Sequence, residues 1–237
     1  LEIRNIGVML VDSSEGDNIT LQQGNDHVWV HNCDLFYGMA GSDADQAKGD
    51  GALDCKKSTY ITFSYNHFWD SGKCNLLGLS EDTTDGLYIT YHHNWYDHSD
   101  SRHPRVRFYS AHVYNNYYDG NSKYGIGSTL GSSVFAESNY FRNCKYPMLT
   151  SMQGSDVADG AEGTFSSEDG GTIKAYGNYM EGQKRFVSYQ EDSVEFDAYV
   201  ASSRNEKLSS SVTSKQGSNT YNLSLIHISE PTRQEAI

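Results

Sequence analysis

The chain has 237 residues and a formal net charge of −13, from 18 lysines and arginines against 31 aspartates and glutamates. This length suits one sizeable domain, and the acidic balance excludes a general basic surface for nucleic acid. No apolar run reaches 18 residues, so no membrane-spanning helix is expected. The cysteines lack the C-x-x-C spacing of a thiolate zinc site, and they fit either buried free thiols or a bridge between Cys33 and Cys55.

A short unit recurs along the chain, an alternating apolar strand that ends in asparagine with neighbouring aromatic residues. The units occupy 28–32, 60–68, 87–96, 111–118, 134–141 and 172–180. Their asparagines are separated by 34, 28, 22, 23 and 39 residues. The shortest spacings match one coil of a parallel β-solenoid, and the longer ones match a coil with a side loop.

The physical chemistry of this repeat favours a solenoid. One coil is too small to bury its own apolar face, so coils stack and form a continuous interior. Asparagine tolerates the left-handed backbone of a sharp turn, and stacked amides can hydrogen-bond along a ladder. The alternative, a β-sandwich, would need regular Asn-Gly or Asp-Gly hairpin turns, which these units do not supply. The sequence therefore predicts an all-β chain with almost no helix.

Two acidic groups stand near the start of the chain. Glu15 and Asp17 are separated by one residue ahead of a strand, and acids at i and i+2 of an extended chain point the same way. Asp50 and Asp54 follow in Asp50-Gly-Ala-Leu-Asp54. A single Asp-Gly is most often a surface turn. Carboxylates from neighbouring coils would instead converge on one edge of the solenoid, which predicts an oxygen-rich Ca²⁺ site.

The segment Asp100-Ser-Arg-His-Pro-Arg-Val-Arg-Phe108 places three arginines within six residues. So dense a cationic group on an acidic chain indicates a local anionic ligand. Pro104 fixes the backbone, and Arg105 and Arg107 then alternate with their side chains on one face of a strand. Arg102 precedes the proline and can reach the same region from the turn.

In their order, these motifs resemble the pectate lyases of polysaccharide lyase family 1. The resemblance runs from about residue 2 to about residue 200. It is carried by Asp17-Asn-Ile-Thr, Val28-Trp-Val-His, Asp50-Gly-x-x-Asp54, the Lys73 loop, Tyr91-His-His-Asn94, Arg102-x-Pro-Arg-Val-Arg107-Phe and His112-Val-Tyr-Asn-Asn-Tyr-Tyr118. It implies a right-handed parallel β-helix, in agreement with the repeat.

The resemblance also implies an activity, β-elimination across a 1,4-linked galacturonan such as polygalacturonate or pectin. The enzyme would act as a monomer, without nucleic acid or membrane as a partner. Because the substrate is a polymer of plant cell walls, we expect a protein that is secreted, periplasmic or attached to the cell surface.

The resemblance assigns the acidic residues to calcium. Asp17, Asp50 and Asp54 fall where the family binds Ca²⁺, and Glu15 falls where some members carry a further acid. His31 is a departure, because the family commonly has aspartate there. That aspartate is not taken as a direct calcium ligand, so the metal site is still expected.

The cationic residues receive roles in the same way. Arg102 matches the arginine regarded as catalytic, and Lys73 and Arg107 match residues that hold substrate carboxylates. Arg105 is expected to contact substrate or to orient the acidic site. A neutral guanidine is scarce near neutral pH, and neighbouring cations favour the neutral form. We therefore expect an alkaline optimum if Arg102 is the base.

Three other functions compete with this one. A pectin lyase would act on methyl-esterified polymer without calcium, and the three acids argue against it. A hydrolytic polygalacturonase would need paired catalytic carboxylates at the inverting separation, and none stands beside the arginines. A non-catalytic β-helix could bind polysaccharide through its many tyrosines, but it would not need the whole set of acids and arginines.

We expect residues 1–222 to form one catalytic β-helix that lacks the N-terminal coils and capping helix of the family. Residues 223–237 have neither the repeat nor the family pattern, and they resemble a translated sequencing adaptor. They are therefore expected to be a non-native tail outside the fold.

Overall fold

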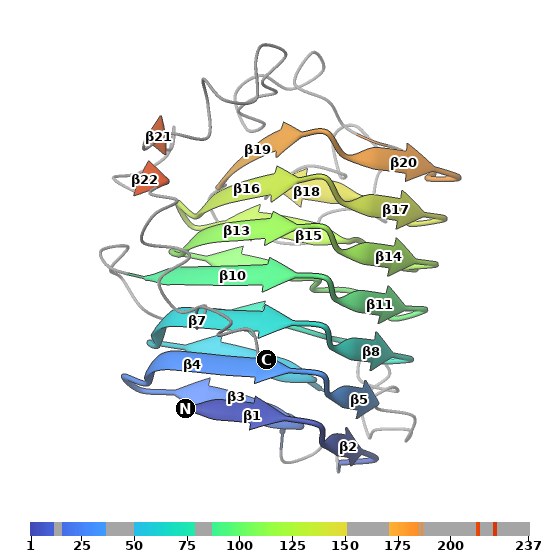
Figure 1. Ribbon diagram of the computed structural model, residues 1–237. Coiled ribbons are helices and arrows are strands. Elements are labelled where there is room, and N and C mark those ends of the chain that lie inside the picture. Colours follow the sequence, from blue (N-terminus) through green and yellow to red (C-terminus); the bar gives the residue numbers. More distant parts are fainter. Residues whose placement is uncertain are drawn as a thin grey trace, which may run out of the picture.

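A computed structural model of the chain describes residues 1–11, 16–36, 50–78, 87–150, 171–184 and 186, with the strand residues 212–213 and 220–221. The described residues form three long sheets, in which all strands are parallel, and they contain no helix. Figure 1 shows the coils stacked above one another, each adding one strand to each sheet from β1 to β18. The predicted parallel β-helix is confirmed, whereas the predicted tail, 223–237, lies outside the described residues.

The strands follow one another along each sheet in hydrogen-bonded order. The first sheet consists of β1 (Glu2–Arg4), β4 (Asp26–His31), β7 (Thr59–Ser64), β10 (Tyr88–His92), β13 (Ser110–Tyr114), β16 (Ser133–Glu137) and β19 (Thr172–Tyr176). The second consists of β2 (Gly7–Met9), β5 (Asp34–Phe36), β8 (His67–Trp69), β11 (Trp95–Asp97), β14 (Tyr117–Asp119), β17 (Tyr140–Arg142) and β20 (Tyr179–Glu181). The third consists of β3 (Ile19–Gln22), β6 (Leu53–Lys56), β9 (Leu76–Leu77), β12 (Arg105–Arg107), β15 (Ile126–Thr129) and β18 (Met148–Thr150). A separate antiparallel pair joins β21 (Val212–Thr213) to β22 (Thr220–Tyr221).

The core is a column of side chains that repeats from coil to coil. In the second sheet the middle residue of each three-residue strand points inward, because side chains alternate along a strand. Phe68, Tyr96, Tyr118 and Phe141 stack in this column, with ring centroids 5.0, 4.9 and 4.3 Å apart. All four are fully buried, and each such ring pair adds about 0.5–1.5 kcal/mol beyond simple burial.

The predicted asparagine ladder is present at the corner between the first and second sheets. The Oδ1 of Asn94 accepts from the backbone N–H of Asn66 at 3.1 Å, and the Oδ1 of Asn116 accepts from Asn94 at 3.0 Å. The series continues through Asn139 and Asn178 at 3.0 and 2.9 Å. Each Nδ2 also donates to a carbonyl of the preceding coil. The ladder therefore satisfies backbone groups that the turn would leave unpaired.

One detail of the predicted ladder was wrong, and a second holds only in part. The ladder position of the first complete coil is held by Cys33, whose N–H donates to Asn66 at 3.1 Å, and Asn32 lies one residue earlier. The left-handed backbone also belongs to the residue before each ladder asparagine, for example Tyr65 and His93 with φ of 55° and 53°. The ladder asparagines are used for their amides, whereas Asn32 and Asn115, each with φ of 52°, take the left-handed turn position that the repeat predicted for asparagine.

The four cysteines are buried free thiols, so the alternative of a bridge between Cys33 and Cys55 is wrong. The two residues lie at different sheets of the coil, Cys33 just before β5 and Cys55 within β6. None of the described segments forms an apolar helix of the length that a bilayer requires.

Candidate active site on the third sheet

The outward face of the third sheet is built from side-chain rows that cross the coils. The strand register aligns Thr20, Asp54, Leu76, Arg105 and Gly127 in one row. Isolated bridges align Gly51, Lys73 and Ser101 in the turns just before these strands. The acids therefore lie on the earlier coils and the arginines on the later ones, with Lys73 between them.

Asp17 and Asp54 converge on Gly51, although 37 positions in the sequence separate them. A methyl group at Gly51 would stand 2.5 Å from Oδ1 of Asp54 and 2.6 Å from Oδ1 of Asp17. The N–H of Gly51 donates to Asp17 at 3.0 Å, and the Thr20 hydroxyl donates to it at 2.6 Å. Two carboxylates thus form a cradle that only a residue without a side chain leaves open.

The cradle carries a buried negative charge that the surroundings partly offset. Asp54 is 2% exposed, and this burial raises its pKa to about 8, with the nearby Asp17 carboxylate adding to the rise. Lys56 Nζ stands 3.6 Å from Asp17 and 3.9 Å from Asp54. The N–H of Leu76 donates to Asp54 at 2.8 Å. Near neutral pH the pair therefore retains a proton, which a bound cation would displace.

The position of Lys56 beside both carboxylates was not predicted from the sequence. The strand alternation could have predicted this position, because Asp54 and Lys56 are two residues apart in one strand and side chains at i and i+2 share a face.

Asp50 does not join this pair in the structure. Its Oδ1 lies 3.5 Å from Lys73 Nζ. Within the described residues, the carboxylates of Asp17, Asp50 and Asp54 do not form a set whose oxygens all lie within 4.8 Å of one another. The fourth predicted metal residue, Glu15, lies outside the described residues. The acidic half of the site is thus a close pair with a third acid held beside it by Lys73.

The arginines are arranged as the alternation predicts. In β12, Val106 is buried in the core while Arg105 and Arg107 are partly exposed on the other face. Arg102 precedes this strand with a left-handed backbone, φ 65°, and its carbonyl accepts the N–H of Asn75 at 2.8 Å. The strand and the turn thus direct three cations toward one face, one coil beyond Lys73.

Tyr124 and His103 hold the arginine turn, and neither was found from the sequence. Tyr124 is buried beside all three arginines and hydrogen-bonds to Arg102; burial raises the pKa of its hydroxyl, and the cations limit that rise. The imidazole of His103 is fully buried and bonds through Nδ1 to the carbonyl of Tyr124 at 2.8 Å. This burial lowers the pKa of His103 to about 4. Both residues act across coils, so no local pattern marks them.

His31, the departure from the family pattern, lies on the first sheet and therefore outside this site. It stacks on Trp29 with ring centroids 3.6 Å apart, and its Nε2 lies 2.9 Å from Glu2. Its role in the structure is packing at the first coils.

Known proteins match this chain over most of its described length. Residues 3–221 match the pectate lyase family model. The chain is 35% identical over 149 residues to the pectate trisaccharide-lyase of Bacillus licheniformis, a match that covers 62% of this chain and 43% of that protein. It is 36% identical over 157 residues to pectate lyase A of Emericella nidulans, a match that covers 64% of this chain and 46% of that protein. The chain thus spans less than half the length of these relatives.

Solved structures share the fold. The chain matches a Bacillus pectate lyase in complex with trigalacturonate with a TM-score of 0.63 and 28% identity, over 76% of this chain and 56% of that one. It matches pectate lyase II of Xanthomonas campestris with a TM-score of 0.63 and 29% identity, over 78% of this chain and 55% of that one. With its parallel β-helix and a family match that covers most of its length, this chain belongs to the pectate lyase family.

Proposed function

We propose that this chain carries the active site of a calcium-dependent pectate lyase, which cleaves 1,4-linked galacturonan by β-elimination and releases unsaturated oligogalacturonides. The observation that carries the proposal is the layout of the third sheet, where an acid cradle, a lysine and three arginines share one face. A polymer of sugar acids needs cations at its carboxylates, and this face concentrates them on a chain of net charge −13.

The acid cradle fits a calcium ion. Its donors are carboxylate oxygens, the ligands that Ca²⁺ prefers, and Gly51 leaves the space between them open. Asp17 and Asp54 would hold the ion, with Asp50 and Glu15 as further ligands. The ion would supply Lewis-acid stabilisation for the charge that develops on the substrate carboxylate.

Lys73 and Arg107 would bind substrate carboxylates, and Arg107 can do so through two parallel N–H donors. Arg105 lies two residues earlier on the same face and would contact the neighbouring sugar or orient the acids. These contacts fix the galacturonate ring against the sheet, so that its C5 proton faces the turn that carries Arg102.

Arg102 would act as the base. As a neutral guanidine it would take the C5 proton; the C4–O bond breaks, a C4–C5 double bond forms, and the leaving oxygen gains a proton from solvent. Tyr124 and His103 would keep the Arg102 turn in place during this step. Because the substrate is an extracellular polymer, we also propose that the protein acts outside the cytoplasm.

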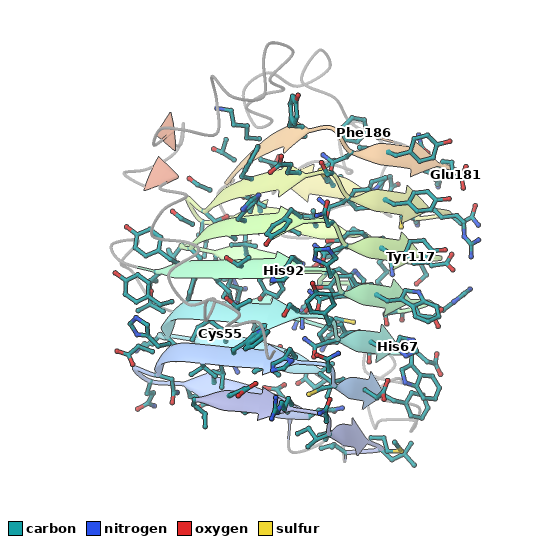
Figure 2. The ribbon with its side chains drawn as sticks, viewed as in Figure 1. Cys55, His67, His92, Tyr117, Glu181 and Phe186 are labelled. Atoms are coloured by element: carbon teal, nitrogen blue, oxygen red, sulfur yellow. The ribbon has the colours of Figure 1, made fainter. Side chains whose placement is uncertain are left out.

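The alternative function, a non-catalytic β-helix that binds polysaccharide, draws little support from the aromatic row of the second sheet. The outward row of the second sheet consists of His67, Trp95, Tyr117, Tyr140 and Tyr179. Its first four rings stack on one another, with centroids 4.3, 6.2 and 5.2 Å apart. Figure 2 shows two members of this row, His67 and Tyr117, on the side of the second sheet. The facing sides of these four rings therefore contact each other and are not open for sugar stacking, whereas Tyr179 at the end of the row is 60% exposed.

The test is ultraviolet absorbance of unsaturated product from polygalacturonate, with calcium and with chelator. We expect calcium-dependent product, and Arg102→Lys should lower kcat by at least about 100-fold. Arg4→Lys is the matched control, because Arg4 is exposed on the first coil, where it pairs with Glu2 at 3.4 Å. Calcium-independent activity confined to methyl-esterified polymer would replace this proposal with a pectin lyase.

A further inference from the structure

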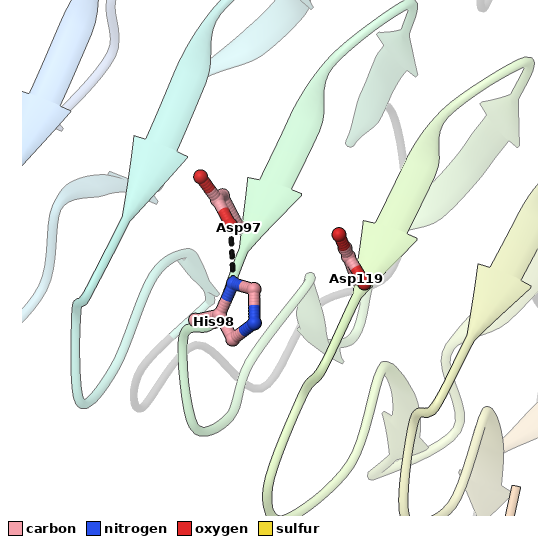
Figure 3. Close-up of side chains that lie close together, drawn as sticks. All are labelled: Asp97, His98 and Asp119. Atoms are coloured by element: carbon pink, nitrogen blue, oxygen red, sulfur yellow. Dashed lines mark hydrogen bonds and ion pairs between the residues drawn. The ribbon is translucent and has the colours of Figure 1, made fainter. Parts of the chain in front are cut away.

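We propose that Asp97, His98 and Asp119 form a second metal site, for a late first-row divalent ion such as Zn²⁺. Each residue offers one ligand atom, and these three atoms all lie within 4.8 Å of one another (Figure 3). Within the described part of the chain this is the one such group of three. It belongs to the second sheet and its turn, whereas the acid cradle belongs to the third.

Two adjacent coils build the site. Asp97 ends β11 and Asp119 ends β14, and the register places them side by side. His98 follows Asp97 with a left-handed backbone, φ 50°, and its Nδ1 hydrogen-bonds to Asp97 Oδ1. Gly120 faces the imidazole, where a methyl group would stand 2.9 Å from Cδ2. The ring can lie between the two carboxylates because Gly120 has no side chain.

The surrounding groups orient both carboxylates. Arg142 donates two hydrogen bonds to Asp119, one of them from Nε at 2.9 Å, and Tyr117 donates a third at 3.1 Å. His67 stands with Nε2 3.3 Å from Asp97. Partners of this kind fix ligating carboxylates around metals.

The charge of the site also favours a dication. The two carboxylates of Asp97 and Asp119 carry two negative charges against the one positive charge of Arg142, which pairs with Asp119. The side chain of His98 is 69% exposed, so an ion can reach the site from solvent.

The ligand types decide which ion fits. The site offers one imidazole nitrogen and two carboxylates, ligand types that Zn²⁺ accepts, and Zn²⁺ takes about four ligands at about 2.0–2.2 Å. Calcium takes six to eight oxygen ligands and should prefer the acid cradle. The bound ion would join the turn after β11 to the turn after β14. It would therefore stabilise the coils irrespective of any lyase activity.

The experiment measures zinc binding by calorimetry and the thermal midpoint of the whole chain, with Zn²⁺ alone and with Ca²⁺ alone. His98→Gln removes the imidazole ligand, and it should fold because the side chain is exposed. His27→Gln is the matched control, because His27 is also exposed, has φ 50°, and lies 3.7 Å from its neighbour Asp26 but lacks a third ligand.

We expect Zn²⁺ to raise the midpoint of the wild-type chain and of His27→Gln alike. In His98→Gln the zinc affinity should fall by at least about tenfold, while the calcium response stays unchanged. The proposal is overturned if zinc gives no shift in the wild-type chain, or if the shift persists in His98→Gln. If the chain bound zinc as expected but showed no lyase activity, the result would contradict the proposed function and would support the zinc site.

Discussion

Gly51→Ala tests the acid cradle most directly. The added methyl group would stand 2.5 and 2.6 Å from the carboxylate oxygens of Asp54 and Asp17, against about 3.4 Å for ordinary van der Waals contact. The carboxylates would therefore have to move by about 0.9 Å. The backbone of Gly51 does not have positive φ, so the substitution introduces crowding without conformational strain.

The consequences follow from the size of this displacement. Overpacking of a buried site costs about 1–3 kcal/mol of unfolding free energy, and a misplacement of about 1 Å can lower activity by about 100-fold. We expect both effects in Gly51→Ala, together with weaker calcium binding, because the two ligands can no longer approach the same ion.

The assay combines product absorbance across a calcium titration with urea unfolding. Gly7→Ala is the control, since its methyl group would meet Met9 at 3.6 Å, an ordinary contact; its stability should change by less than about 0.5 kcal/mol. If Gly51→Ala kept wild-type calcium affinity and activity, the cradle would not be the metal site. The reasoning from Asp17 and Asp54 would then be refuted.

Three further predictions concern the asparagine ladder, the arginine turn and the cation beside the cradle. Asn116→Ala should lower the urea-unfolding free energy by about 2–4 kcal/mol, because it leaves buried backbone groups of two coils unpaired; a loss under 1 kcal/mol would contradict the ladder's role. His103 has a folded pKa of about 4 against 6.5 unfolded, so the unfolded chain binds the extra proton and stability falls by about 3 kcal/mol as pH drops from 6.5 to 4. In His103→Asn that part of the acid sensitivity should disappear from urea midpoints compared at these two pH values. Lys56→Met should tighten calcium binding by at least about tenfold in calorimetry, because a cation beside both carboxylates is removed; unchanged affinity would show that Lys56 does not compete with the ion.

Much of the fold could be predicted from local patterns. Stacking of small apolar units predicted the solenoid, and the alternation of Arg105, Val106 and Arg107 predicted which side chains face outward. These predictions succeed because side-chain direction along a strand depends only on the local alternation. The repeat unit also predicted the asparagine ladder, although it placed Asn32 where the structure has Cys33.

Only the tertiary structure decided which residues meet across the coils. The coils differ in length, so sequence spacing alone does not set the register that brings Asp17 and Asp54 to Gly51 or turns Asp50 toward Lys73. Burial of Asp54, with its raised pKa, likewise arises from neighbouring coils. Asp97 and Asp119 become a pair for the same reason. The sequence by itself determined the solenoid and the residue types of the site, and the stacking register determined their geometry, because contacts between coils depend on alignment over the whole stack.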